Sequence, residues 1–161
     1  MVKTDDRDQP RPNAVPWPPL LLALAIAGAI GLGWAVPVPW FGVDDMPARV
    51  IGYGIGCSGL ALAGWAIVTM AKARANILPH RPATALITSG PFRIWRHPIY
   101  MADVLILLGL AQVTLNLWFV PAAAVFAVLV TVLAIIPEER HLAAQFGDDY
   151  LTWSGRTRRW F

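Results

Sequence analysis

Residues 98–137 read PIYMADVLILLGLAQVTLNLWFVPAAAVFAVLVTVLAIIP and contain one charged side chain, Asp103, in forty positions. One continuous helix of that length would measure about 60 Å at 1.5 Å per residue, roughly twice the thickness of the hydrocarbon core of a membrane. We therefore predict a hairpin of two apolar helices, 98–115 and 117–137. Asn116 and the β-branched Thr114 weaken a helix between them, so the turn is expected there.

Two more stretches, residues 12–43 and 50–71, contain no Asp, Glu, Lys or Arg. Each exceeds the roughly 20 apolar residues that a membrane-crossing helix needs, and we predict spans at about 18–36 and 48–71. Only 14% of the 161 residues are charged. In a typical soluble domain about a quarter of the residues are charged. The predicted fold is all-α, with four transmembrane helices in one domain, 18–161.

Small residues recur on one face of the second predicted span, at Gly52, Gly56, Gly59 and Ala63. Such a face lets another helix backbone approach closely, which we favour over a phosphate-binding glycine loop. The single cysteine, Cys57, excludes a disulfide framework and a cysteine-rich metal site. The small excess of 13 basic over 10 acidic residues disfavours nucleic acid as a partner.

The basic residues indicate the orientation. All except Arg49 lie in the N-terminal segment 1–17, in the loop 72–97 or beyond residue 137. The excess of Lys and Arg on cytoplasmic loops predicts that both termini and this loop are cytoplasmic. The membrane is expected to be the inner or plasma membrane of a bacterium. Residues 1–19 contain five prolines and both signs of charge, and we expect residues 1–17 to form a disordered tail.

An amphipathic helix is predicted at 138–153. Leu142, Phe146, Tyr150 and Trp153 recur at helical spacing, and acidic and basic residues occupy the other positions. This pattern is typical of a helix that lies on the membrane surface with its apolar face among the headgroups.

Polar residues that could bind a ligand or take part in a reaction flank the hairpin. Arg96, His97 and Tyr100 precede or begin its first helix, where Pro98 suits the first turn and the free backbone N–H groups attract anions. Glu138 and Glu139 follow its second helix. A pocket with a cationic and an anionic side suits a zwitterionic cofactor. Alternatively, the basic groups bind lipid phosphate and the acids stabilise a helix start. The three histidines show no metal-ligand spacing.

Two motifs resemble those of a known family. LITSGPFRIWRHPIYMA, residues 86–102, resembles the L-x-T-x-G-P-[FY]-x-x-x-R-H-P-x-Y signature of integral membrane methyltransferases. These include the isoprenylcysteine carboxyl methyltransferases and, more distantly, the phospholipid methyltransferases. EERHLAAQFGDDYLTW, residues 138–153, is similar to the family's E-E-x-x-L-x-x-x-F-G-x-x-Y-x-x-[YW] tail. The resemblance covers roughly residues 72–160.

The resemblance implies an S-adenosylmethionine site in which His97, Tyr100 and the backbone at Pro98 hold the methionine end. Glu138 would hold its amino group. The loop over the adenosine would be shaped by Leu86, Thr88, Gly90 and Pro91. The acceptor would be a lipophilic or lipid-linked molecule at the cytoplasmic face, with membrane lipids as partners. The catalytic roles would fall to Glu139, Asp103 and Arg96.

Two departures keep alternatives open. Eukaryotic isoprenylcysteine enzymes have an Arg shortly before the acidic pair, whereas this chain has Ala, Ile, Ile and Pro at 134–137. The motif RHPIYMAD, which includes Asp103, is also similar to one in NADPH-dependent sterol reductases. The alternatives are a reductase-like relative, or a non-catalytic membrane protein that binds a lipid or a partner.

Overall fold

The computed structural model describes residues 17–73 and 85–160. The described chain is helical and contains no strand, which confirms the all-α prediction; the predicted tail 1–17, except Trp17, and loop residues 74–84 lie outside the described residues. In order, the elements are α1 Trp17–Ala35, α2 Met46–Lys72, the 3₁₀-helix η1 Gly90–Arg93, α3 Pro98–Thr114, α4 Phe119–Val130, the π-helix η2 Thr131–Ile135 and α5 Ile136–Ser154.

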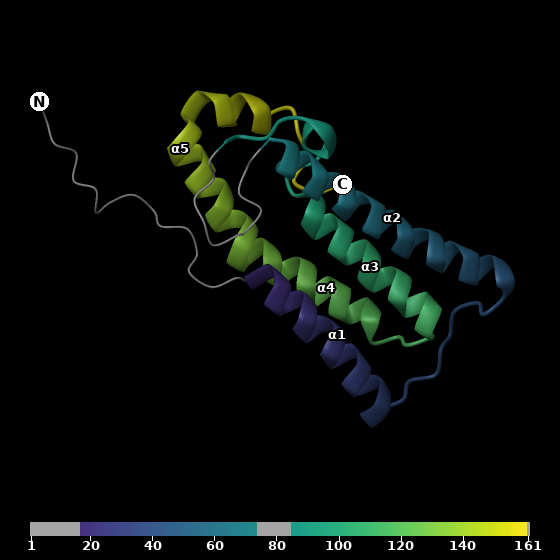
Figure 1. Ribbon diagram of the computed structural model, residues 1–161. Coiled ribbons are helices and arrows are strands. Elements are labelled where there is room, and N and C mark those ends of the chain that lie inside the picture. The colour runs from purple at the N-terminus through teal and green to yellow at the C-terminus, as the bar shows by residue number, and fades with distance from the viewer. Residues whose placement is uncertain (1–16, 74–84, 161) are drawn as a thin grey trace, which may run out of the picture.

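Helices α2 and α3 pack closely against each other at glycine residues. A Cβ atom added to Gly109 would lie only 2.6 Å from the Cα of Gly56, and one added to Gly59 would lie 2.8 Å from the carbonyl oxygen of Ala102. The two backbones therefore touch, as the glycine face of α2 predicted. Figure 1 shows the helices side by side along most of α3.

The hairpin turns where the sequence predicted. Helix α3 ends at Thr114, and Leu115 adopts a left-handed conformation with φ of 52°. The amide of Asn116 donates to the carbonyl of Ala29 in α1 at 2.9 Å, and its oxygen accepts from the N–H of Trp118 at 3.1 Å. One side chain thus caps the turn and ties it to α1, which runs along α4 (Figure 1).

The core lies among α1, α3 and α4. Its largest fully buried side chains include Leu107, Phe119, Phe126, Val130 and Ile135. The outer faces of α1 and α2 are apolar and exposed, for example Leu24 at 67% and Trp34 at 87%. Helices α1, α2 and the continuous helix Phe119–Ser154 are long and apolar enough to cross a membrane. Helix α3 is apolar but has only 17 residues, so the fourth span stays a prediction.

The structure differs from the prediction beyond residue 130, where no break separates a span from a surface helix at Pro137. Helix continues through η2, in which the N–H of Ile136 bonds to the carbonyl of Thr131. This wider turn precedes Pro137, which lacks an N–H and would otherwise interrupt the helix. The direction changes instead inside α5 at Gly147, with φ of 51° and ψ of −125°. The bend turns the last part of α5 across the end of the bundle (Figure 1).

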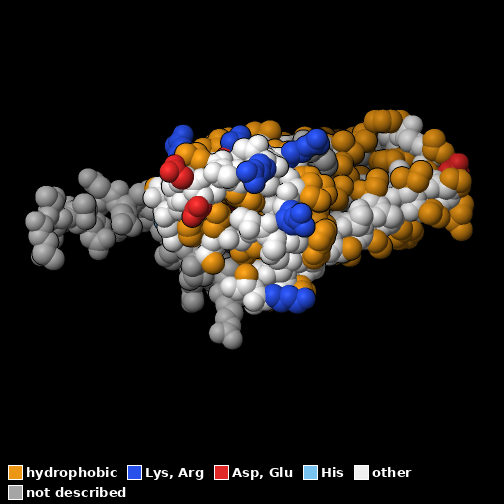
Figure 2. All heavy atoms as spheres, turned by 90° about the horizontal axis from the view of Figure 1, so that it is seen from above, with side chains coloured by type: hydrophobic (Ala, Val, Ile, Leu, Met, Phe, Trp, Pro, Cys, Tyr) orange, Lys and Arg blue, Asp and Glu red, His pale blue; other side chains and the backbone are white. Residues whose placement is uncertain are grey.

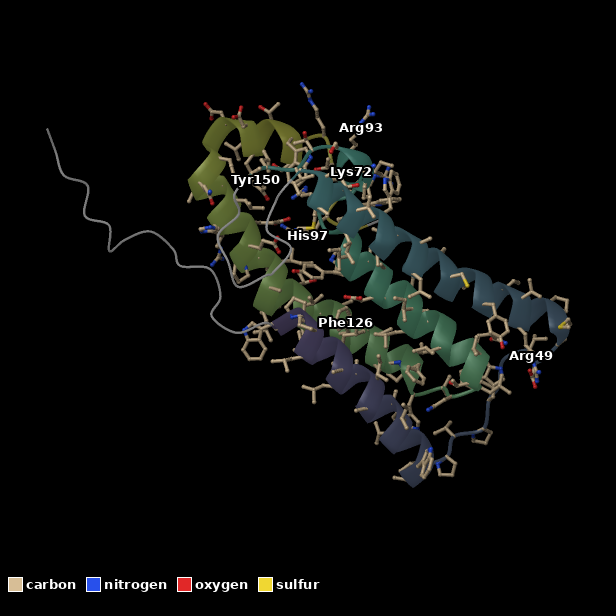
Figure 3. All side chains as sticks on the ribbon, viewed as in Figure 1. Arg49, Lys72, Arg93, His97, Phe126 and Tyr150 are labelled. Carbon is tan, nitrogen blue, oxygen red and sulfur yellow. The ribbon has the colours of Figure 1, made fainter. Side chains whose placement is uncertain are left out.

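The two ends of the bundle carry different charge. Viewed from the α5 end, Lys and Arg side chains gather on one part of the surface together with a few acidic ones, and hydrophobic side chains are dense farther along the molecule (Figure 2). Of the labelled residues, Lys72 and Arg93 lie at this end, and Arg49 lies at the far end of α2 (Figure 3). Which end faces the cytoplasm stays a prediction.

Candidate functional site

Four segments meet at the α5 end of the bundle: the residues just before α3, the first turn of α3, the start of α5, and residues 157–160, which we call the C-terminal strap. The strap pairs with the chain before α3. The N–H of Arg96 donates to the carbonyl of Arg158 at 2.8 Å, and the N–H of Arg158 donates to that of Ile94 at 2.9 Å. The indole of Trp153 also donates to the carbonyl of Phe92 at 2.9 Å, which fastens η1 to the end of α5.

Glu139 lies at the centre of this meeting point, with its side chain 11% exposed. Its Oε1 accepts from Nη1 of Arg96 and from Nε of Arg159, both at 3.1 Å. Its Oε2 accepts from Nη2 of Arg159 at 2.5 Å. Two guanidinium groups at hydrogen-bond distance favour the ionised carboxylate, and in return Glu139 raises the pKa of Arg159.

Glu138 has a different environment, and its side chain is 45% exposed. Its Oε2 accepts from the hydroxyl of Tyr100 at 3.2 Å and lies 3.8 Å from Nδ1 of His97. The other oxygen, Oε1, has no hydrogen bond to any described residue. Glu138 is therefore the carboxylate that can still take a ligand.

His97 lies between the two acids and is 5% exposed. Its Nε2 is 3.4 Å from Oε1 of Glu139, and its Nδ1 faces Glu138. The ring stacks on Tyr100, with 5.6 Å between centroids and 12° between planes. Figure 3 shows His97 beside the start of α3, facing α5.

The structure thus brings together five of the predicted site residues: Arg96, His97, Tyr100, Glu138 and Glu139. The other predicted positions lie around this cluster. Pro98 is buried at the first turn of α3. Gly90, with φ of 59°, packs on α2, because a Cβ there would lie 2.5 Å from Oγ1 of Thr69. Pro91 is buried and Leu86 is half-buried, whereas Thr88 is exposed.

Asp103 lies in α3 about one turn beyond Tyr100 and is half-buried. It makes no hydrogen bond or ion pair with another residue in 17–73 or 85–160. Asp103 therefore takes no part in the ion pairs of the cluster, although it interacts electrostatically with Tyr100 on the same helix.

Sequence reasoning missed the strap. Arg159, which makes two hydrogen bonds to Glu139, counted only toward the orientation of the chain in the membrane. Thr157, whose carbonyl accepts from Nη2 of Arg96 at 3.2 Å, was not considered. The available signal was the acidic pair itself, because a buried carboxylate requires a cationic or hydrogen-bonding partner.

The cluster can hold a small zwitterion by its two kinds of group. Glu138 offers a half-exposed anion. At the start of α3 the first intrahelical bond runs from the N–H of Met101 to the carbonyl of His97, so the N–H groups of Ile99 and Tyr100 precede the helical ladder. Free N–H groups at a helix start attract a carboxylate. The residues present therefore fit a ligand with one ammonium and one carboxylate.

Comparison with known proteins found two curated bacterial relatives. The chain is 33% identical over 81 residues to the cobalt-zinc-cadmium resistance protein CzcN of Cupriavidus metallidurans. It is 29% identical over 83 residues to the nickel-cobalt-cadmium resistance protein NccN of Alcaligenes xylosoxydans xylosoxydans. Each match covers 50% of this chain, and 37% and 38% of the respective relatives. No solved structure matches significantly.

A comparison with family models matched a larger part of the chain. The model of the phospholipid methyltransferase family matches residues 47–149, from the start of α2 to the last turns of α5. This region includes His97, Tyr100 and the acidic pair. The match spans more than half of the 161 residues. The chain therefore belongs to the phospholipid methyltransferase family.

Proposed function

We propose that this protein transfers a methyl group from S-adenosylmethionine to a lipophilic acceptor at the cytoplasmic face of the membrane. The observation that carries the proposal is the unequal acidic pair at the start of α5. Glu139 is enclosed by Arg96, Arg159 and His97, whereas Glu138 keeps an oxygen without a described partner. A ligand with an ammonium and a sulfonium complements that free anion, and the family match supports methyl transfer.

The chain's residues would act mainly by binding and orientation. S-adenosylmethionine would supply an activated methyl group on a sulfonium. Glu138 would bind its ammonium, and the first N–H groups of α3, next to His97, would bind its carboxylate. In-line displacement at carbon needs alignment and exclusion of water more than proton transfer, so fixed partners can provide much of the rate.

The hydrogen bonds of Glu139 affect which kind of methyl acceptor the site can serve. Its oxygens already accept hydrogen bonds from Arg96 and Arg159, so Glu139 is better suited to orienting its neighbours than to taking a proton from an acceptor. A carboxylate acceptor is ionised at neutral pH and needs no base, whereas an amine needs one. The arrangement favours a carboxylate, and His97 would be the base for an amine.

The location of the site supports a membrane-bound acceptor. The cluster lies at one end of a bundle whose outer faces are apolar, and basic side chains gather at the same end (Figure 2). Such basic ends are cytoplasmic in membrane proteins, and both curated relatives come from bacteria. We therefore place the acceptor among the lipids or lipid-linked molecules of the cytoplasmic leaflet of a bacterial membrane.

Cofactor binding tests the proposal. Calorimetry of the detergent-solubilised protein should show binding of S-adenosylmethionine and of S-adenosylhomocysteine, and none of NADPH. Both expected ligands carry the same amino-acid end, which is the part that the cluster complements. Binding of NADPH alone would replace the proposal by the reductase alternative, and binding of none of the three would favour a non-catalytic membrane protein.

Asp103 gives a second prediction within this function. A carboxylate at that depth in an apolar helix is costly and usually serves function, and Asp103 has no hydrogen bond or ion pair to a described residue. Asp103→Asn keeps the shape and removes the charge. We expect unchanged affinity for S-adenosylhomocysteine and a loss of roughly tenfold or more in methyl incorporation into a membrane lipid extract, from losing one charged contact to the acceptor. Asp103→Ala serves as comparison. Normal turnover in both variants would remove Asp103 from the reaction.

A further inference from the structure

The C-terminal strap is tied to the site at several points. Arg158 pairs with the backbone before α3, and Thr157 is 8% exposed with its carbonyl accepting from Arg96. The indole of Trp160 donates to Oγ1 of Thr131 in η2 at 3.3 Å. Between these anchors Arg159 reaches Glu139. The strap therefore holds the guanidinium of Arg159 against Glu139.

This contact makes the two neighbouring acids unequal. The carboxylate of Glu139 has four close polar contacts, two of them from Arg159. A carboxylate accepts about four hydrogen bonds, so Glu139 is nearly saturated. Glu138 has the hydroxyl of Tyr100 and the more distant ring of His97.

Without Arg159 this division would weaken. Glu139 would keep Arg96 and His97 as its only described partners, and Arg96 is also bonded to the carbonyl of Thr157. Two adjacent carboxylates would then share too little positive charge, and His97 would be drawn more strongly to Glu139. His97 would lose its placement between the acids.

We propose that Arg159 is a positioning residue that acts through Glu139, fixing His97 and leaving Glu138 as the carboxylate available to the cofactor's ammonium. The inference rests on the proposed function and deepens it, because it assigns the arrangement of the cofactor site to the last residues of the chain. Arg159 itself touches no substrate in this arrangement.

Three variants of the full chain test the inference by calorimetry with S-adenosylhomocysteine. Arg159→Gln should weaken binding by about tenfold, because hydrogen bonds to a charged group are lost. Arg159→Lys should recover part of that affinity, since it keeps the charge but not the two-point contact. Arg158→Gln is the matched control. Its side chain is exposed, and its hydrogen bonds to the chain before α3 come from the backbone, so the affinity of this variant should equal that of the parent.

A double-mutant cycle distinguishes a role of Arg159 through Glu139 from a direct contact between Arg159 and the ligand, and from a purely stabilising role in the fold. In the Glu139→Gln background, Arg159→Gln should change affinity by less than about twofold, because the effect passes through Glu139. An equal loss in both backgrounds would overturn the inference. So would equal losses in the glutamine and lysine variants, which would indicate that the strap only stabilises the fold.

The outcome also distinguishes this inference from the proposed function. If the parent protein binds no S-adenosylhomocysteine, the proposed function fails. If the parent binds it and Arg159→Gln binds equally well, the function stands and the role of Arg159 is rejected.

Discussion

Glu138→Gln should weaken S-adenosylhomocysteine binding by about 1.5–3 kcal/mol, which corresponds to roughly a 10- to 150-fold rise in Kd. The substitution keeps the size of the side chain and its bond from Tyr100, and removes the negative charge that faces the ligand's ammonium. Glu138 is 45% exposed, so the protein should fold normally. Calorimetry in detergent measures the change directly.

Asp149→Asn is the control for this prediction. It makes the same charge change in the same helix, at an exposed position beyond the bend at Gly147. His97→Ala should act in the same direction as Glu138→Gln, because it removes the ring between the two acids. Parental affinity in folded Glu138→Gln and His97→Ala proteins would show that the ligand binds elsewhere.

The apolar architecture could be predicted from the sequence, because few alternatives exist for long stretches without charge. The predicted spans 18–36, 48–71 and 98–115 match α1, α2 and α3 within two residues at each end. The turn at Asn116 followed from the length of the apolar stretch and from Thr114 and Asn116, which weaken a helix there. Both signals are local and strong.

The end of the fourth predicted helix could not be predicted in the same way. Pro137 and the charges after it predicted a break, but the helix continues through the π-helix Thr131–Ile135, whose wider turn directly precedes the proline. The bend at Gly147 places Tyr150 and Trp153 against the protein, with Tyr150 buried and Trp153 bonded to Phe92. Their spacing indicated an apolar face correctly but could not show which surface it covers.

The site was predictable where it is local in sequence. Arg96, His97 and Tyr100 lie within five residues, and the acidic pair is adjacent, so a hairpin suffices to bring them together. Arg159 is 20 residues beyond Glu139 and reaches it only because α5 bends and the strap pairs with the chain before α3. Tertiary contacts of this kind leave no period or motif in the sequence.

Gly109→Leu should destabilise the folded protein by about 3 kcal/mol, at the upper end of the usual cost of overpacking. The Cβ position at Gly109 is 2.6 Å from the Cα of Gly56 and 3.0 Å from the carbonyl oxygen of Gly52. These are backbone atoms, so no neighbouring side chain can rotate away and α2 and α3 must separate. Unfolding in detergent, followed by circular dichroism, measures the loss.

Gly64→Leu is the matched control, because a Cβ there meets nothing within 4 Å. Leucine also favours helix over glycine, so this variant should be as stable as the parent or slightly more stable. The comparison bears on the site as well, because α3 begins at the residue after His97 and contains Tyr100. If α2 is the support that holds α3 in place, Gly109→Leu should weaken S-adenosylhomocysteine binding in the protein that remains folded, whereas Gly64→Leu should leave it unchanged. Equal stability of the two variants would show that α2 and α3 are not in backbone contact.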